Sequence, residues 1–171
     1  MFDRWGNNTG NDVWVLPLVG EPRAEPLIAT ANNEGNGVVS PDGRWIAYVS
    51  DESGRIEVYV RGFPRSSGKW QVSTEGAREP LWSRGGRELF YRSLEGNLTV
   101  VAVTLNPVFS AGKARLVYSG PFRMGGRTNF DITPEGDRFL IVTDAEAAPI
   151  KQLRVVVNWL TEIKAHVRAK N

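Results

Sequence analysis

The stretch VSPDGRWIAYVS at residues 39–50 decides the fold, because similar stretches recur along the chain. WSRGGRELFYRS at 82–93 and ITPEGDRFLIVT at 132–143 align with it without gaps. The copies start at residues 39, 82 and 132, so successive starts lie 43 and then 50 residues apart. A β-rich unit of this length has room for four short strands, which is typical of a propeller blade.

Each copy carries the residues of a tight hairpin turn between two β-rich runs. Ser or Thr opens the turn and can bond back to the backbone, and Pro presets φ at the next position. Gly43, Gly86 and Gly136 then supply a positive φ without a Cβ penalty. The copy at 82–93 has Arg84 and Gly85 in place of the Pro-acid pair, so it is the weakest of the three.

Two more β-rich runs follow each of the first two hairpins. Residues 56–60 and 98–103 come after a Gly-containing turn and are expected to form a third strand. Residues 69–73 and 114–119 are expected to form a fourth. Segments 32–75 and 76–120 are therefore each predicted to be a complete blade of four antiparallel strands.

The two ends of the chain are predicted to hold incomplete blades. Segment 1–31 offers two strands, at 12–16 and 26–29, and is expected to be a half blade. Segment 121–159 offers the third hairpin and a strand at 153–159, and a short helix is expected over 160–171. The prediction is an all-β chain of thirteen strands, about three β-propeller blades, with a C-terminal helix.

The hairpins and the C-terminal segment resemble known propeller sequences. The SPDG turn at 40–43 resembles the TolB-type propeller repeat, and FDITPEG at 130–136 with VVVNWL at 155–160 resembles the last blades of bacterial signalling proteins. In those proteins such propellers are fused to Ser/Thr kinase or DNA-binding domains. The resemblance implies a propeller fold and says little about function, because propellers serve many unrelated activities.

About three blades are too few for a closed propeller, which typically has four to eight. An open arc exposes two apolar sheet faces and unpaired strand edges. We expect a second copy to complete the ring as a homodimer of roughly six blades, in which the N-terminal strands of one chain join the last blade of the other. The alternatives are a piece of a longer propeller and a smaller or distorted closed unit.

Composition favours a globular domain with no nucleic-acid partner. The 171 residues are 41% hydrophobic with a net charge of +2, and no basic cluster stands out. No apolar run is long enough to insert in a membrane, and the first residues lack a secretory signal. The compartment stays open: the missing signal favours the cytoplasm, whereas the resemblance to TolB-like proteins favours the periplasm.

No catalytic apparatus and no cofactor site is predicted, so the protein is not expected to be an enzyme. His166 is the single histidine of the sequence, there is no cysteine, and no Gly-x-Ser-x-Gly elbow occurs. One histidine cannot make a zinc site, and the acidic turns lack the spacing of a calcium loop. The Gly-rich stretch at 124–127 lacks the residues of a phosphate-binding loop.

One set of polar residues is predicted to bind a ligand at the mouth of the central channel. Asn36, Glu79 and Asn129 each stand four residues before the hairpin Ser or Thr, and Arg78, Arg127 and Thr128 lie nearby. Rigid scaffolds commonly carry function at such positions. The sequence therefore predicts a non-enzymatic module for protein or peptide binding or assembly; the alternative is a regulatory or accessory propeller fragment of a larger enzyme or sensor, such as a signalling kinase or a peptidase.

Overall fold

The computed structural model describes residues 1–6, 10–65, 68–120, 122–123 and 128–143. These residues form fourteen β-strands in four antiparallel sheets, and this described part contains no helix. The all-β prediction with antiparallel sheets is confirmed. The predicted strand at 153–159 and the predicted helix at 160–171 lie outside the described residues.

The first two sheets hold half of the strands, and neighbours along the chain pair with one another. The first sheet has the order β1 (Phe2–Gly6), β2 (Gly10–Val15), β3 (Glu25–Ile28). The second has the order β4 (Glu34–Val39), β5 (Trp45–Ser50), β6 (Glu57–Gly62), β7 (Lys69–Gln71).

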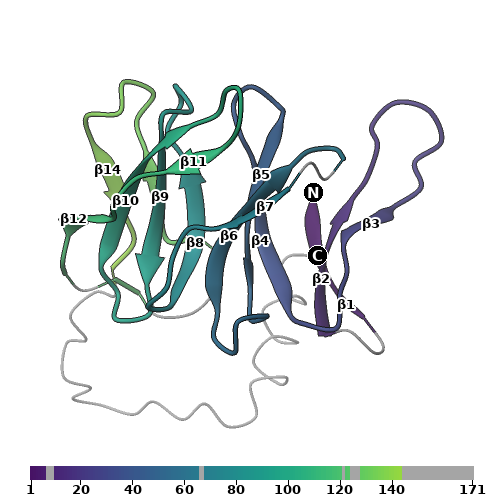
Figure 1. Cartoon of the computed structure of the whole chain (residues 1–171), viewed down its shortest axis with the longest axis horizontal. Helices are drawn as coiled ribbons and strands as arrows, with labels where there is room; N and C mark the ends of the chain where they lie inside the picture. Colours follow the sequence, from purple (N-terminus) through teal and green to yellow (C-terminus); the bar gives the residue numbers. More distant parts are fainter. Residues whose placement is uncertain (7–9, 66–67, 121, 124–127, 144–171) are drawn as a thin grey trace, which may run out of the picture.

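The third sheet repeats this meander, and the fourth is a hairpin. The third contains β8 (Ala77–Trp82), β9 (Glu88–Ser93) and β10 (Leu98–Thr104), and β10 pairs on its other side with β11 (Ser110–Ala111) and β12 (Arg115–Tyr118). The fourth pairs β13 (Phe130–Ile132) with β14 (Phe139–Ile141). Figure 1 shows the sheets side by side, from β1–β3 at one end to β13–β14 at the other.

The three repeated turns form the same hydrogen bonds. In the first, the Ser40 N–H donates to the carbonyl of Trp45 at 2.8 Å, the Trp45 N–H donates to the Ser40 hydroxyl at 3.0 Å, and the Gly43 N–H closes onto the Ser40 carbonyl at 2.9 Å. Gly43 has φ of 71°, as the turn chemistry predicts. Equivalent bonds join Ser83, Gly86 and Glu88, and Thr133, Gly136 and Arg138.

The central strand β5 shows how the sheets stack. All six of its residues are buried, and alternate side chains point to opposite faces of the sheet. Trp45, Ala47 and Val49 enter the core shared with the third sheet, whereas Ile46 and Tyr48 enter the core shared with the first. Neighbouring sheets therefore cover both faces of the second sheet.

Aromatic rings fill the space between the second and third sheets. Trp45 packs edge-on against Trp70 with ring centroids 5.4 Å apart. Phe109, in the loop between β10 and β11, lies 5.6 Å from Trp45 and 5.5 Å from Trp70 between ring centroids. Trp70 therefore packs against this core from the edge strand β7. A third cluster, which includes Phe90 and Phe130, joins the third sheet to β13–β14.

The first sheet has one strand more than the sequence predicted. The sequence predicted two N-terminal strands and did not identify β1. The structure has a three-stranded sheet there, in which Asp3 of β1 pairs with Val13 of β2. A glycine permits its close approach to the second sheet. A Cβ on Gly37 would lie 2.7 Å from the sulfur of Met1 and 2.9 Å from a methyl of Val13.

Truncation inside the shared core should destabilise the whole arc. Leu89 is fully buried between the second and third sheets, so Leu89→Ala should lower the free energy of unfolding by about 2–5 kcal/mol. Leu116→Ala, at a position 57% exposed, is the matched control and should change it by less than about 0.5 kcal/mol. Urea unfolding measures both. Equal losses in the two variants would contradict the stacking described above.

Candidate functional site

Asn36 and Glu79, two of the polar residues predicted at the channel mouth, fall at a structural irregularity that two sheets share. The pairing of β4 with β5 shifts register between Gly35 and Val38, and the pairing of β8 with β9 shifts between Arg78 and Leu81. Each shift is a β-bulge, which leaves backbone groups outside the ladder and re-aims side chains.

Asn36 and Glu79 occupy the equivalent bulge positions and share a left-handed backbone. Their φ angles are 50° and 56°, and the structure records no other non-glycine residue with positive φ among those described. Asparagine tolerates this conformation well, whereas for a glutamate it is uncommon and costs energy. Contacts elsewhere must therefore hold Glu79 in place.

Buried polar contacts supply that restraint. Glu79 is 1% exposed and forms an ion pair with the guanidinium of Arg92, which is also 1% exposed. The Asn129 N–H donates to the second carboxylate oxygen of Glu79 at 3.1 Å, and Arg92 donates to the Arg123 carbonyl at 3.0 Å. This Glu79 cluster, defined as Glu79, Arg92 and Asn129, ties the third sheet to the segment that leads into β13.

Asn36 faces a different environment from Glu79. It is half-buried, and its N–H donates to the carboxylate of Asp3 on β1 at 3.2 Å. It lines a small cavity of about 130 Å³ together with residues of β1, residues of β4 and Thr128. The bulge therefore presents Asn36 to a cavity and sets Glu79 in an ion pair.

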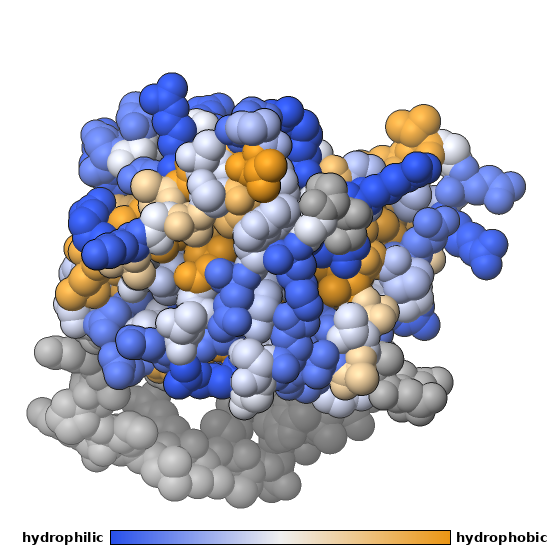
Figure 2. Space-filling model, viewed as in Figure 1, coloured by the Kyte–Doolittle hydropathy of each residue, from blue (hydrophilic) through white to orange (hydrophobic). Residues whose placement is uncertain are grey.

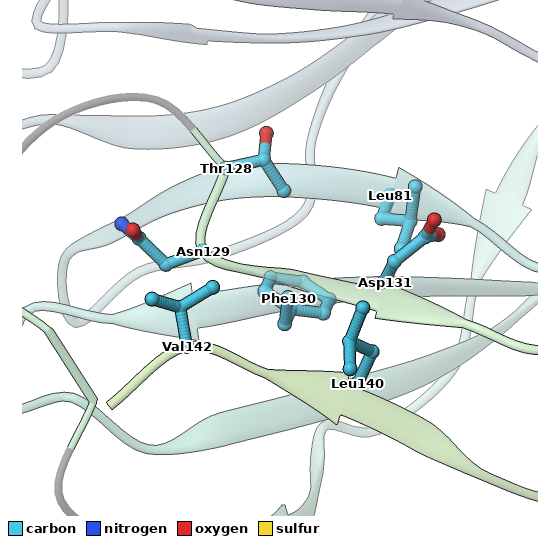
Figure 3. A pocket seen from close by; sticks show the side chains of 7 residues that line it. All are labelled: Leu81, Thr128, Asn129, Phe130, Asp131, Leu140 and Val142. Atoms are coloured by element: carbon cyan, nitrogen blue, oxygen red, sulfur yellow. The ribbon is translucent and has the colours of Figure 1, made fainter. Parts of the chain in front are cut away.

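A larger cavity of about 360 Å³ lies beside the start of β13. Thr128 and Asn129 border it from the segment before the strand, and Figure 3 shows them with the other lining residues: Leu81, Phe130, Asp131, Leu140 and Val142. Thr128 thus borders both cavities. The lining of the larger cavity combines three polar residues with four apolar ones.

The structure brings together some of the residues predicted to bind a ligand. Asn129 contacts Glu79, and Thr128 shares a cavity with Asn36. Glu79 and Asn129 are buried and hydrogen-bonded to each other, and Asn129 also borders the larger cavity. The Nε of Arg78 is buried with no hydrogen-bond partner among the described residues. Arg127 lies outside the described residues, and ligand binding at this set stays a prediction.

Sequence reasoning missed the acidic residues that hold the connections between sheets. The Glu57 carboxylate accepts the Gly76 N–H at 2.8 Å and pairs with Arg55 at 3.0 Å. Burial raises the pKa of Glu34, although hydrogen bonds from Thr30 act in the opposite direction. No sequence motif marks these acids, because their partners depend on the register of the strands.

The sheets at the two ends of the arc each turn one face away from the shared cores. Apolar side chains are exposed on this face of β13–β14, whereas Phe2 and Trp14 on the outer face of the first sheet are half-buried. On β13–β14, Asp131 pairs with Leu140, which is 71% exposed, and Val142 follows at 42%. The alternate residues of the same strands, such as Phe130 and Phe139, face the core of the third sheet. We call Asp131, Leu140 and Val142 the β13–β14 face.

The opposite end is the outer face of the first sheet. Phe2 pairs with Trp14, and the guanidinium of Arg4 lies 4.4 Å from the ring centroid of Trp14. The alternate residue Val13 is buried toward the second sheet. We call Phe2, Arg4 and Trp14 the β1–β2 face. Figure 2 shows apolar residues at the surface toward both ends of the arc, among hydrophilic ones.

The described residues have neither a candidate metal centre nor a membrane-spanning helix. They contain no group of three or more His, Cys, Asp or Glu side chains placed to hold a metal ion. None of them belongs to a helix long and apolar enough to cross a membrane.

Comparison with known proteins supports the fold. No family model matches the sequence, and no curated protein matches it. Among solved structures, the chain is similar to the crystal structure of TolB from Acinetobacter baumannii, with a TM-score of 0.50 and 13% identity. The match covers 82% of this chain and 45% of that one, so the chain spans less than half the length of that TolB structure. The arc is built of TolB-like β-propeller blades.

Removing the charge of Glu79 should destabilise the fold strongly. Glu79→Gln removes the carboxylate that pairs with the buried Arg92 guanidinium, and the free energy of unfolding should fall by about 3–5 kcal/mol. Glu52→Gln is the control: Glu52 pairs with Lys69 at the surface, and its loss should cost less than about 1 kcal/mol. Thermal and urea unfolding of the two variants provide the comparison. Similar stability in both would mean that the Glu79 cluster is not a structural anchor.

Proposed function

We propose that the protein is a non-catalytic β-propeller module that binds protein, and that its first partner is a second copy of itself. The observation that carries this proposal is the pair of end faces. The second sheet of the arc is covered on both sides, whereas Leu140 on the β13–β14 face is 71% exposed. A sheet face with this composition is stable in a propeller when another blade covers it.

The two end faces suit each other in charge and in apolar character. Arg4 stands on the β1–β2 face and Asp131 on the β13–β14 face, so contact between the faces of two copies would join opposite charges. Leu140 would meet the aromatic side chains of Phe2 and Trp14. Burying a leucine of this kind contributes about 1.5–3 kcal/mol. Two symmetric contacts would double this gain, because each copy supplies both faces.

The extra strand β1 changes how the ring is expected to close. With only two N-terminal strands, the first sheet of one chain was expected to join strands of the other chain in a single blade. The first sheet instead has three strands and already forms a layer of its own. Contact between faces is therefore the favoured arrangement. Two chains would then supply about eight sheets, within the four to eight blades typical of closed propellers.

A second function is favoured by the comparison with TolB. Because this chain matches 45% of that protein, its end faces could equally be covered by further blades of a longer polypeptide. In that case the module would be a regulatory or accessory part of a larger sensor or enzyme. The two functions differ in the state of the isolated chain: self-assembly predicts a dimer, and an accessory fragment predicts none.

The mass in solution and a charge exchange test the assembly. Light scattering should give twice the chain mass of 19.0 kDa. Arg4→Asp and Asp131→Arg should each shift the protein toward the monomer, because each places like charges in contact. The double variant should restore the dimer, since it reverses both charges.

A second substitution pair checks the apolar part of the contact. Leu140→Asp should give a monomer, whereas Leu18→Asp, in a loop where Leu18 is 93% exposed, should remain dimeric. A wild-type monomer with a cooperative thermal transition would overturn self-assembly and leave the accessory function in place.

A further inference from the structure

A groove separates the hairpin of the second sheet from that of the third. It has a volume of about 820 Å³ and lies between the turns at residues 40–44 and 83–87, which are along the upper edge of the arc in Figure 1. Its walls are the two turns, and its third side is the end of β10 with the loop that follows. The lining residues that matter below are Asp42, Arg44, Gly85, Arg87, Val103 and Leu105.

The first turn neutralises its own arginine. The carboxylate of Asp42 pairs with the guanidinium of Arg44 at 2.9 Å and also accepts the hydroxyl of Ser40. Although burial acts to raise it, hydrogen bonds from Ser40 and Arg44 hold the pKa of Asp42 below its usual value. Asp42, the acid of this repeat, therefore neutralises the charge of Arg44.

The second turn keeps the arginine and lacks the acid. Counted from the turn serine, Gly85 stands where the first turn has Asp42, and Arg87 stands where it has Arg44. The same backbone bonds close both turns, so these positions are equivalent in space as well as in sequence. Arg84 and Arg87 are exposed, and no acidic residue of the described chain forms an ion pair with either.

We propose that this groove binds an acidic peptide segment of another protein, and that a carboxylate of the partner pairs with Arg87 where Asp42 pairs with Arg44 in the neighbouring repeat. A guanidinium matches a carboxylate in planar, two-bond geometry. Val103 and Leu105 give the groove an apolar side that suits the aliphatic side chains of such a peptide.

A peptide fits the groove better than a nucleic acid. The groove is lined by Arg87 and by Arg44, which already pairs with Asp42, and these are few cations for a phosphate backbone. The chain carries a net charge of only +2. Aromatic side chains for stacking bases are absent from the residues that line the groove. The groove also lies between the two central sheets and away from both end faces, so this proposal stands or falls independently of the dimer.

The chain offers a direct variant for this proposal. Gly85→Asp restores the acid of the repeat: Gly85 does not have a left-handed backbone, and a Cβ there would meet nothing within 4 Å. The new carboxylate should pair with Arg87 and compete with the carboxylate of a bound peptide. Arg87→Gln removes the cation instead. Arg115→Gln, an exposed arginine on β12 that does not line the groove, is the matched control.

The experiment measures the fluorescence anisotropy of a labelled peptide, SELDVELS, at low salt, with its amide counterpart SQLNVQLS and a single-stranded oligonucleotide of three phosphates for comparison. The wild-type protein should bind the acidic peptide in preference to both, and added salt should weaken binding. Arg87→Gln and Gly85→Asp should each weaken it about fivefold or more, and Arg115→Gln should leave it unchanged. Circular dichroism verifies that each variant is folded.

The opposite results would overturn the proposal. No binding by the wild-type protein, equal binding of the amide peptide, or unchanged affinity in both groove variants would each exclude an acidic peptide paired with Arg87. Tighter binding of the oligonucleotide would assign the groove to a phosphate backbone instead.

Discussion

In strand β5, alternate side chains enter two different cores, and the rest of the arc depends on this double coverage. Trp45 and Val49 pack toward the third sheet while Ile46 and Tyr48 pack toward the first. A sheet whose two faces are both apolar cannot be stable in water by itself, so each sheet requires neighbours on either side. The stacking order and the aromatic packing both follow from this one constraint.

Local turn chemistry could be predicted from the sequence, whereas pairing between distant strands could not. Ser40 and Gly43 act within a few residues of each other, so their bonds follow from the residue types alone. Strand β1 was missed because the sequence before β2 holds no copy of the repeated hairpin. Its place depends on packing against the second sheet, where the missing side chain of Gly37 leaves room for Met1.

The predicted channel site shows why equal positions in a repeat can have different roles. Asn36 and Glu79, which both stand four residues before the turn, occupy equivalent bulges in the structure. This spacing could not show that Glu79 would be buried against Arg92, because Arg92 lies 13 residues away on the neighbouring strand. The register of β8 with β9 brings the two together, and a β-bulge is not visible in a single sequence.

The turn at 83–87 indicates which parts of a repeat are free to take on a function. Its hydrogen bonds at Ser83, Gly86 and Glu88 match those of the first turn even though the Pro-acid pair is replaced. The backbone therefore needs the hydroxyl and the glycine, and it does not need the acid. A side chain that the turn does not require can change the charge of the surface at little cost in stability. Here the change leaves Arg87, beside a groove, with no acidic partner among the residues that the structure describes.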